Sequence, residues 1–115
     1  MDEKKKIVSD LINKIDGIYG DIAVCNLEAG YTALSNAIPV INSVFAEFIR
    51  YIPKLKELGV DIPADVLIQQ LKNLLEAYEY KDSMLLADTL QYEIKDTLTL
   101  YLEILQELEK ENIML

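Results

Sequence analysis

Hydrophobic residues recur along this chain at steps of three and four, the spacing that places them on one side of an α-helix. The first such stripe covers residues 7–19 and has polar residues on its opposite side. It predicts a first helix. Gly17 and Gly20 each lower helix stability by up to about 1 kcal/mol relative to alanine, so we expect a break or bend near these two glycines.

Residues 21–34 are mostly small and less regularly spaced. Small side chains allow helices to approach closely, so this stretch also predicts a helix. Ser35 or Asn36 would then cap a new helix whose first turn holds Pro39. One long helix kinked at Pro39 is the alternative interpretation.

The next stripe covers residues 38–55, and Pro53 is expected either to kink this helix or to begin a last short turn that ends at Gly59. Two signals for the start of another helix follow. Asp61 can accept hydrogen bonds from free backbone N–H groups, and Pro63 suits a first helical turn.

Two further stripes predict helices over residues 66–78 and 83–109. The few residues between them require an αα-hairpin, with Asp82 as the cap of the last helix. No period-two alternation persists, so no strand is predicted. The expected fold is an all-α antiparallel bundle of four or five helices in one domain, residues 1–115. The last helix is expected to be the longest, and the first to pack against it or against a partner subunit.

Charge narrows the choice of partners. Twenty acidic residues against eleven basic ones give a net charge of −9, which repels nucleic acids and anionic membranes and suits a cationic protein partner or divalent cations. The apolar runs are shorter than the roughly 20 residues of a spanning helix, and the polar N-terminus lacks the apolar run of a secretory signal. We therefore expect a cytoplasmic protein that does not contact membranes.

The sequence contains few of the residue types on which catalytic sites depend. Cys25 is the only cysteine, which is typical of a reducing compartment, and we expect it to be a buried structural thiol. The chain has no histidine, which removes mixed Cys/His zinc sites, Glu-x-x-His pairs and the commonest general base. A Mg²⁺ or Ca²⁺ site made of carboxylates alone remains as an alternative, although no EF-hand loop is present.

Residues 76–93 hold five carboxylates and three tyrosines. We interpret the carboxylates as the solvated sides of two helices, with Asp88 facing water; the alternative is that Asp88 lies at a helix interface and accepts from the hydroxyl of Tyr78 or Tyr92. Asp88 and Glu93 do not form a catalytic pair, because a five-residue step turns a helix about 140° beyond a full circuit. Six tyrosines lie beside apolar stripes, and we expect them to pack there with their hydroxyls at the surface; a partner-binding patch is the alternative. They are Tyr19, Tyr31, Tyr51, Tyr78, Tyr92 and Tyr101.

The stretch "LLEAYEYKDSMLLADTLQYEI", residues 74–94, resembles the C-terminal helical hairpin of small uncharacterised helical proteins of Gram-positive bacteria. This resemblance covers about a fifth of the chain and implies no activity. In size, acidity and helix count the chain is also similar to the bundle chaperones that accompany flagellar export substrates. That likeness is one of architecture only.

The leading functional hypothesis is a non-enzymatic interaction protein, an adaptor or small chaperone-like bundle, that binds a partner helix in an apolar groove or self-associates. The expected binding surface is an exposed apolar patch around Phe45, Phe48, Ile49 and Tyr51. No catalytic, cofactor-binding or metal-binding residue is predicted. A metal-dependent hydrolase with a carboxylate cluster is the alternative. A third hypothesis is a purely structural dimerising module, and the apolar content favours a homodimer.

Overall fold

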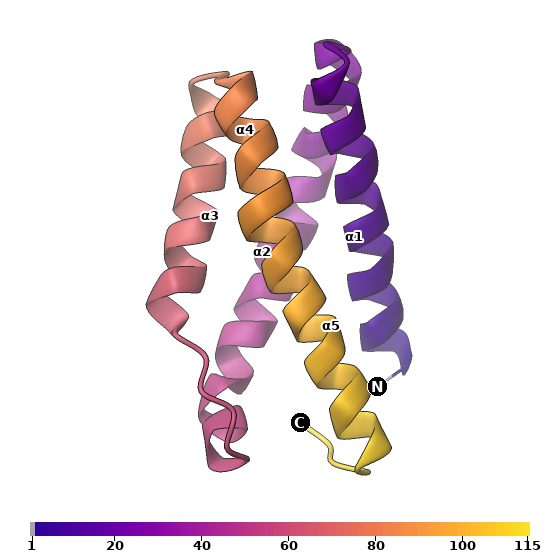
Figure 1. Ribbon diagram of the computed structural model, residues 1–115, viewed down its shortest axis with the longest axis vertical. Coiled ribbons are helices and arrows are strands. Elements are labelled where there is room, and N and C mark those ends of the chain that lie inside the picture. The colour runs from indigo at the N-terminus through magenta and orange to yellow at the C-terminus, as the bar shows by residue number, and fades with distance from the viewer. Residues whose placement is uncertain (1) are drawn as a thin grey trace.

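The computed structural model describes residues 2–115, and these residues form helices joined by short connections (Figure 1). No strand occurs in this range, so the predicted all-α class is confirmed. The last three elements follow one another without interruption and form a single rod, called here the C-terminal rod. The elements in order are α1 (Asp2–Ala23), α2 (Leu27–Glu57), α3 (Ala64–Glu79), α4 (Ser83–Thr89), the π-helical turn η1 (Leu90–Ile94) and α5 (Lys95–Lys110).

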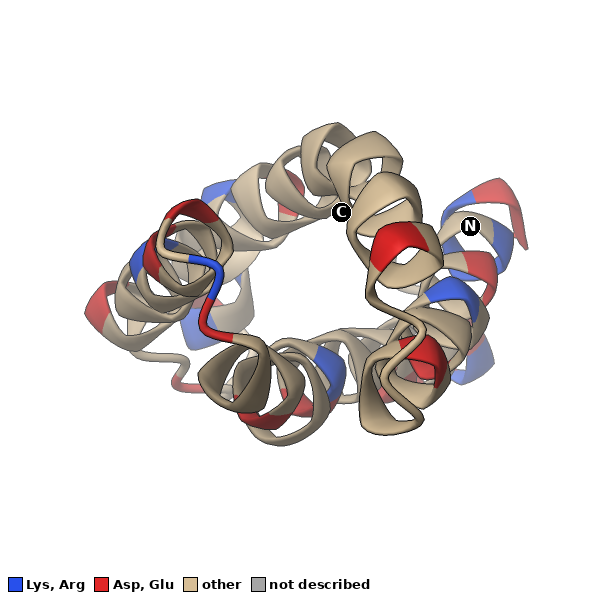
Figure 2. Cartoon of the chain, turned by 90° about the horizontal axis from the view of Figure 1, so that it is seen from above, with Lys and Arg blue, Asp and Glu red and all other residues tan. Residues whose placement is uncertain are grey.

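α1, α2, α3 and the C-terminal rod each run antiparallel to the one before, and together they form an elongated bundle of 44 × 26 × 19 Å. Figure 2 looks down the bundle and shows the helices around a common axis, with acidic segments on several sides. α1 packs against α2 and α5, and α3 packs against α2 and the C-terminal rod. The prediction of an antiparallel bundle is confirmed, and the first helix contacts the last helix of the same chain.

α1 continues through both of its glycines, so the predicted break is wrong. Ile15, Ile18 and Ile22 carry the buried stripe across this region. Gly17 and Gly20 face open space, since a Cβ added at either would meet no atom within 4 Å. The packing of the isoleucines therefore outweighs the roughly 1 kcal/mol that each glycine costs the helix.

The chain reverses between α1 and α2 in a tight turn in which Cys25 has a positive φ of 63°. The helix predicted over residues 21–34 is therefore wrong: α1 ends and α2 begins inside that range, and no new helix starts at Ser35 or Asn36. Gly30 lets the two helices approach closely, because a Cβ at this position would lie 2.9 Å from Cγ1 of Ile22.

α2 passes through Pro39 and Pro53 and, at 31 residues, is the longest helix. The alternative of one long helix is confirmed, and the prediction that the last helix is longest is wrong. Both prolines lie on the exposed side of α2, where water can satisfy the carbonyls that lose their N–H donors. As predicted, the helix ends just before Gly59, which has a φ of +89°.

α2 is also the one helix in the described part of the chain that is long and apolar enough to cross a membrane, judged by length and composition alone. A core helix of a soluble protein passes the same test, so this is weak evidence for a membrane segment. The apolar side of α2 lies in the interior of the bundle, where it contributes part of the common hydrophobic core.

The hairpin between α3 and α4 forms as predicted. The backbone N–H of Leu85 donates to Oδ1 of Asp82 at 3.1 Å, which confirms Asp82 as the helix cap. The start of α3 differs from the prediction. Pro63 itself occupies the N-cap position and no side chain caps this helix, so the expected role of Asp61 is not found.

The π-helical turn η1 keeps one face of the C-terminal rod in the core. Leu86, Leu90, Ile94 and Leu98 are all buried and follow one another at steps of four. In a regular α-helix each such step drifts by about 40° around the axis, so three steps would turn Leu98 away from the core. The wider π turn absorbs one residue and removes this drift.

Candidate functional site: an acidic groove at the open end of the bundle

The predicted exposed patch on α2 is not present. Phe45 and Phe48 are 0% and 1% exposed and belong to the hydrophobic core, so the patch is wrong at these two positions. Ile49 and Tyr51 are half-buried and pack against the same core. The reason is that this side of α2 faces the C-terminal rod, where the Phe48 ring stacks on the Tyr101 ring with centroids 4.5 Å apart.

Tyr101 is fully buried, in contrast to the expectation that its hydroxyl reaches the surface. That hydroxyl donates a hydrogen bond to Oε1 of Glu47. Burial, together with this bond and the negative charge of Glu47, raises the pKa of Tyr101 above its ordinary value. Tyr101 is thus a neutral donor within the core. Tyr92 departs from the expectation in the opposite direction, since it is mostly exposed.

Two other sequence predictions concern single reactive groups. Asp88 is exposed to water, as predicted. Cys25 is exposed, so the prediction of a buried thiol is wrong; the residue lies in the α1–α2 turn and not on a core-facing stripe. Within residues 2–115 no three Cys, Asp or Glu side chains gather in a way that could hold a metal ion.

One groove lies near the end of the bundle that carries the α1–α2 and α3–α4 turns, called here the turn end. It has a volume of about 680 Å³ and is lined from α2, α3 and the start of α4. The rings of Tyr31 and Tyr78 lie 5.9 Å apart, and the Tyr31 hydroxyl is 3.1 Å from Oγ of Ser83. The lining of this groove mixes hydroxyl groups, acidic and basic side chains and two paired aromatic rings. It therefore does not favour one chemical class of ligand.

The second groove, called here the acidic groove, lies at the opposite end, called the open end. It has a volume of about 520 Å³. One wall comes from the end of α2 and the connection that follows it, and the other from α5 and the C-terminal residues. The lining residues are Leu58, Val60, Leu100, Glu103, Ile104, Glu107, Leu108, Glu111 and Ile113.

The acidic groove follows from unequal helix lengths. α2 has 31 residues and α3 has 16, which correspond to lengths of about 46 Å and about 24 Å. The N-terminus of α3 therefore lies well short of the open end. Residues 58–63 connect α2 to it as an irregular segment (Figure 1). The open end thus has three helices and a connection where the turn end has four helices, and α5 is left partly uncovered.

Two adjacent stripes of α5 give the acidic groove its chemistry. Leu100, Ile104 and Leu108 repeat at steps of four and form an apolar floor, in which Leu100 is 40% exposed whereas Ile104 and Leu108 are buried. A second stripe, called here the acidic rim, repeats at the same step directly beside it and consists of Glu103, Glu107 and Glu111. The groove therefore combines exposed apolar surface with charge of a single sign.

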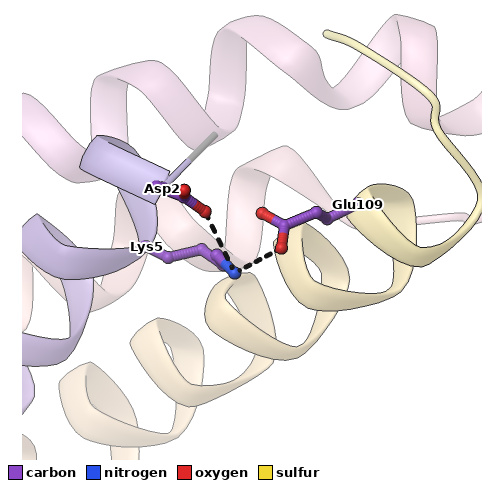
Figure 3. A network of polar contacts seen from close by, with 3 residues as sticks. All are labelled: Asp2, Lys5 and Glu109. Atoms are coloured by element: carbon purple, nitrogen blue, oxygen red, sulfur yellow. Dashed lines mark hydrogen bonds and ion pairs between the residues drawn. The ribbon is translucent and has the colours of Figure 1, made fainter.

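The other side of α5 has its charge neutralised. Nζ of Lys5 donates to Oε1 of Glu109 at 2.8 Å and lies 3.6 Å from Oδ1 of Asp2 (Figure 3). The hydrogen bond to Glu109 raises the pKa of Lys5, so this lysine stays charged where α1 begins and α5 ends. In the described part of the chain no lysine or arginine lies within 4.0 Å of any carboxylate of the acidic rim.

Fold and site together define an acidic bundle with the acidic groove at its open end. Comparison with known protein families, with curated proteins and with solved structures finds no match to this chain. The acidic groove was missed in the sequence reasoning, although a signal was present: an acidic repeat beside an apolar repeat, both at steps of four near the end of the last helix.

Proposed function

We propose that this chain is a non-enzymatic cytoplasmic interaction module that binds a helical segment of a protein partner in the acidic groove. One observation carries the proposal: where α3 does not extend to the open end, the acidic groove has an exposed leucine on each of its two walls. Leu58 on one wall and Leu100 on the floor are 39% and 40% exposed.

A helix is the element that suits this space. The lining of α5 runs from Leu100 to Glu111, about 16 Å along the axis, which equals about three helical turns. A helix laid beside α5 would bury the exposed parts of the leucines and complete the four-helix arrangement present at the turn end. Burial of apolar side chains from both partners drives this mode of recognition.

The proposal is tested by photocrosslinking in the cell that expresses the protein. A benzophenone side chain replaces Leu100 in one variant and Val66 in a second; Val66 is 45% exposed on α3 and lies outside the acidic groove. We expect a discrete adduct from position 100 and none from position 66. Mass spectrometry then shows whether the adduct contains another protein or a second copy of this chain.

The crosslinking result is checked with the purified adduct partner. Leu100→Ser should weaken its binding at least tenfold and leave the circular dichroism spectrum unchanged, because the leucine is partly exposed and its loss opens no closed cavity. Equal adducts from both positions, or binding that Leu100→Ser does not change, would contradict the proposal.

A further inference from the structure

We infer that the occupant of the acidic groove is a cationic amphipathic helix that runs antiparallel to α5 and places Lys or Arg residues opposite the acidic rim. This inference rests on the proposed function and specifies the chemistry and orientation of the partner. It is carried by the juxtaposition of two exposed leucines, Leu58 and Leu100, with the three unneutralised carboxylates of the acidic rim.

The acidic rim is unfavourable for the isolated chain. Glu103, Glu107 and Glu111 repeat at i, i+4 and i+8, the spacing at which like charges on a helix repel one another. Glu107 lies in the last turn of α5 and Glu111 directly follows it, where the helix dipole already presents its negative end. Folding alone does not favour this arrangement, whereas a row of cations beside it would remove the repulsion.

Two carboxylates of α1 outside the groove already have cationic partners. Asp10 pairs with Lys6, and Asp16 pairs with Lys95 from the start of α5, each at 2.7 Å. Lys5 and Lys95 join α1 to α5, whereas no basic residue in the described part of the chain pairs with the acidic rim. The net charge of −9 adds a long-range attraction for a cationic partner.

The same electrostatics select an orientation. An occupant antiparallel to α5 places its N-terminus, the positive end of its dipole, beside the negative C-terminal end of α5. It also continues the alternation of the bundle, in which α1, α2, α3 and the C-terminal rod run in alternating directions (Figure 1). A partner segment of about eleven residues spans the groove, with apolar residues on one stripe and cations at steps of four along its edge.

The test uses two fluorescein-labelled helical peptides of fourteen residues with the same leucine stripe, one with lysines along its edge and one with glutamates. Anisotropy is measured at about 0.15 M ionic strength, where screening over about 8 Å removes most of the effect of distant charges. We expect the lysine peptide to bind at least tenfold more tightly than the glutamate peptide, and its affinity to fall as salt rises.

Two triple variants separate the acidic rim from the overall charge. The triple variant E103Q/E107Q/E111Q should lower affinity for the lysine peptide at least tenfold. The matched triple variant E76Q/D88N/D96N removes the same charge from exposed positions outside the groove. It should change the affinity for the lysine peptide less than twofold. Equal effects of the two triple variants would overturn the assignment of the rim.

The orientation of the bound peptide is measured by energy transfer from a donor dye on Cys25. This exposed residue is the only cysteine and lies at the turn end of the bundle. Antiparallel binding predicts stronger transfer to an acceptor on the C-terminus of the peptide than on its N-terminus. The reverse order would overturn the predicted orientation.

The outcomes distinguish the inference from the proposed function. If both peptides bind equally and Leu100→Ser abolishes both complexes, the groove binds helices but the cationic partner is wrong. If neither peptide binds and the crosslinking variants give no specific adduct, the proposed function fails as well. Binding of the lysine peptide that Leu100→Ser does not weaken would place the peptide elsewhere on the surface and overturn the inference.

Discussion

At the scale of single residues, glycines that look equivalent in the sequence have different roles. Gly17 and Gly20 sit in a helix with free space around them, whereas Gly30 of α2 lies close to Ile22 of α1. The difference lies in what a methyl group would meet at each position. The same substitution should therefore have opposite effects on stability.

Gly30→Ala should lower the free energy of unfolding by about 1–2 kcal/mol, because the new Cβ would lie 2.9 Å from Cγ1 of buried Ile22. Gly17→Ala is the matched control and should raise stability by about 0.5–1 kcal/mol through better helix propensity. Urea denaturation followed by circular dichroism measures both. Changes of the same sign would show that the α1–α2 contact is not tight.

Tyr101 should make the protein sensitive to alkali. Its pKa is raised in the folded state, so the native protein keeps this proton above pH 10 while the unfolded chain releases it. The contribution of protonated Tyr101 to the free energy of unfolding is therefore fully present below about pH 10. As pH rises further, the free energy of unfolding falls by up to about 1.4 kcal/mol per pH unit until Tyr101 also ionises in the native state.

The variant Tyr101→Phe isolates this effect. It should cost about 1–2 kcal/mol at neutral pH, since Glu47 loses the hydroxyl that donates to it. Above pH 10 its stability should fall less steeply than that of the parent, because phenylalanine has no proton to lose. Urea denaturation as a function of pH measures both quantities, and parallel slopes would contradict the assignment.

At the scale of elements, the helices owe their length and continuity to packing more than to local propensity. α1 crosses two glycines and α2 crosses two prolines, since each carries an uninterrupted buried stripe. The buried residues of the C-terminal rod repeat at steps of four, and the rod keeps them in the core by forming a π turn at residues 90–94. The core thus determines where the backbone must depart from regular α-helical geometry.

Deletion of exposed Tyr92 should convert this π turn into a regular α-helical turn. The step between the buried residues Leu90 and Ile94 would shorten from four to three, and the steps before and after it would stay at four. This spacing matches the α-helical repeat, so the variant should fold with little loss of stability. Deletion of exposed Lys72 is the control. It should cost about 2–5 kcal/mol, because Leu74 and Ala77 would rotate out of the core.

Thermal and urea unfolding of the two deletion variants measure this difference. Equal destabilisation by both deletions would show that the π turn is not the means by which the rod keeps its register.

At the scale of the whole molecule, the fold places a strip of uncompensated negative charge beside exposed apolar surface at one end. This end is stabilised by the Asp2–Lys5–Glu109 network on one side of α5 and strained by the acidic rim on the other (Figure 3). An arrangement that costs stability in the free protein is consistent with selection for binding.

The triple variant E103Q/E107Q/E111Q should accordingly raise the free energy of unfolding of the free protein by about 1 kcal/mol at low salt, from relief of two i, i+4 repulsions and of the unfavourable dipole contact. High salt should reduce this gain by screening. Urea denaturation at the two salt concentrations measures it. A variant less stable than the parent would mean that the rim carboxylates hold the fold together.

The sequence by itself determined the helical class, the positions of the buried stripes, the α3–α4 hairpin and its cap at Asp82. These features depend on residues three and four apart or on a single turn, so the local pattern contains them. The sequence also marked Phe45 and Phe48 as apolar stripe residues, but a stripe does not say whether another helix covers it. Only the packed structure shows that they are covered.

The tertiary structure decided the rest. The glycines and prolines predicted to interrupt helices each carry a local cost of a few kcal/mol at most, and packing along a whole helix face exceeds it. The acidic groove arises because α3 is much shorter than the helices beside it, a relation between elements far apart in the chain. Local periodicity reports which side of a helix is apolar, and only the assembled bundle determines which part of that side is left uncovered.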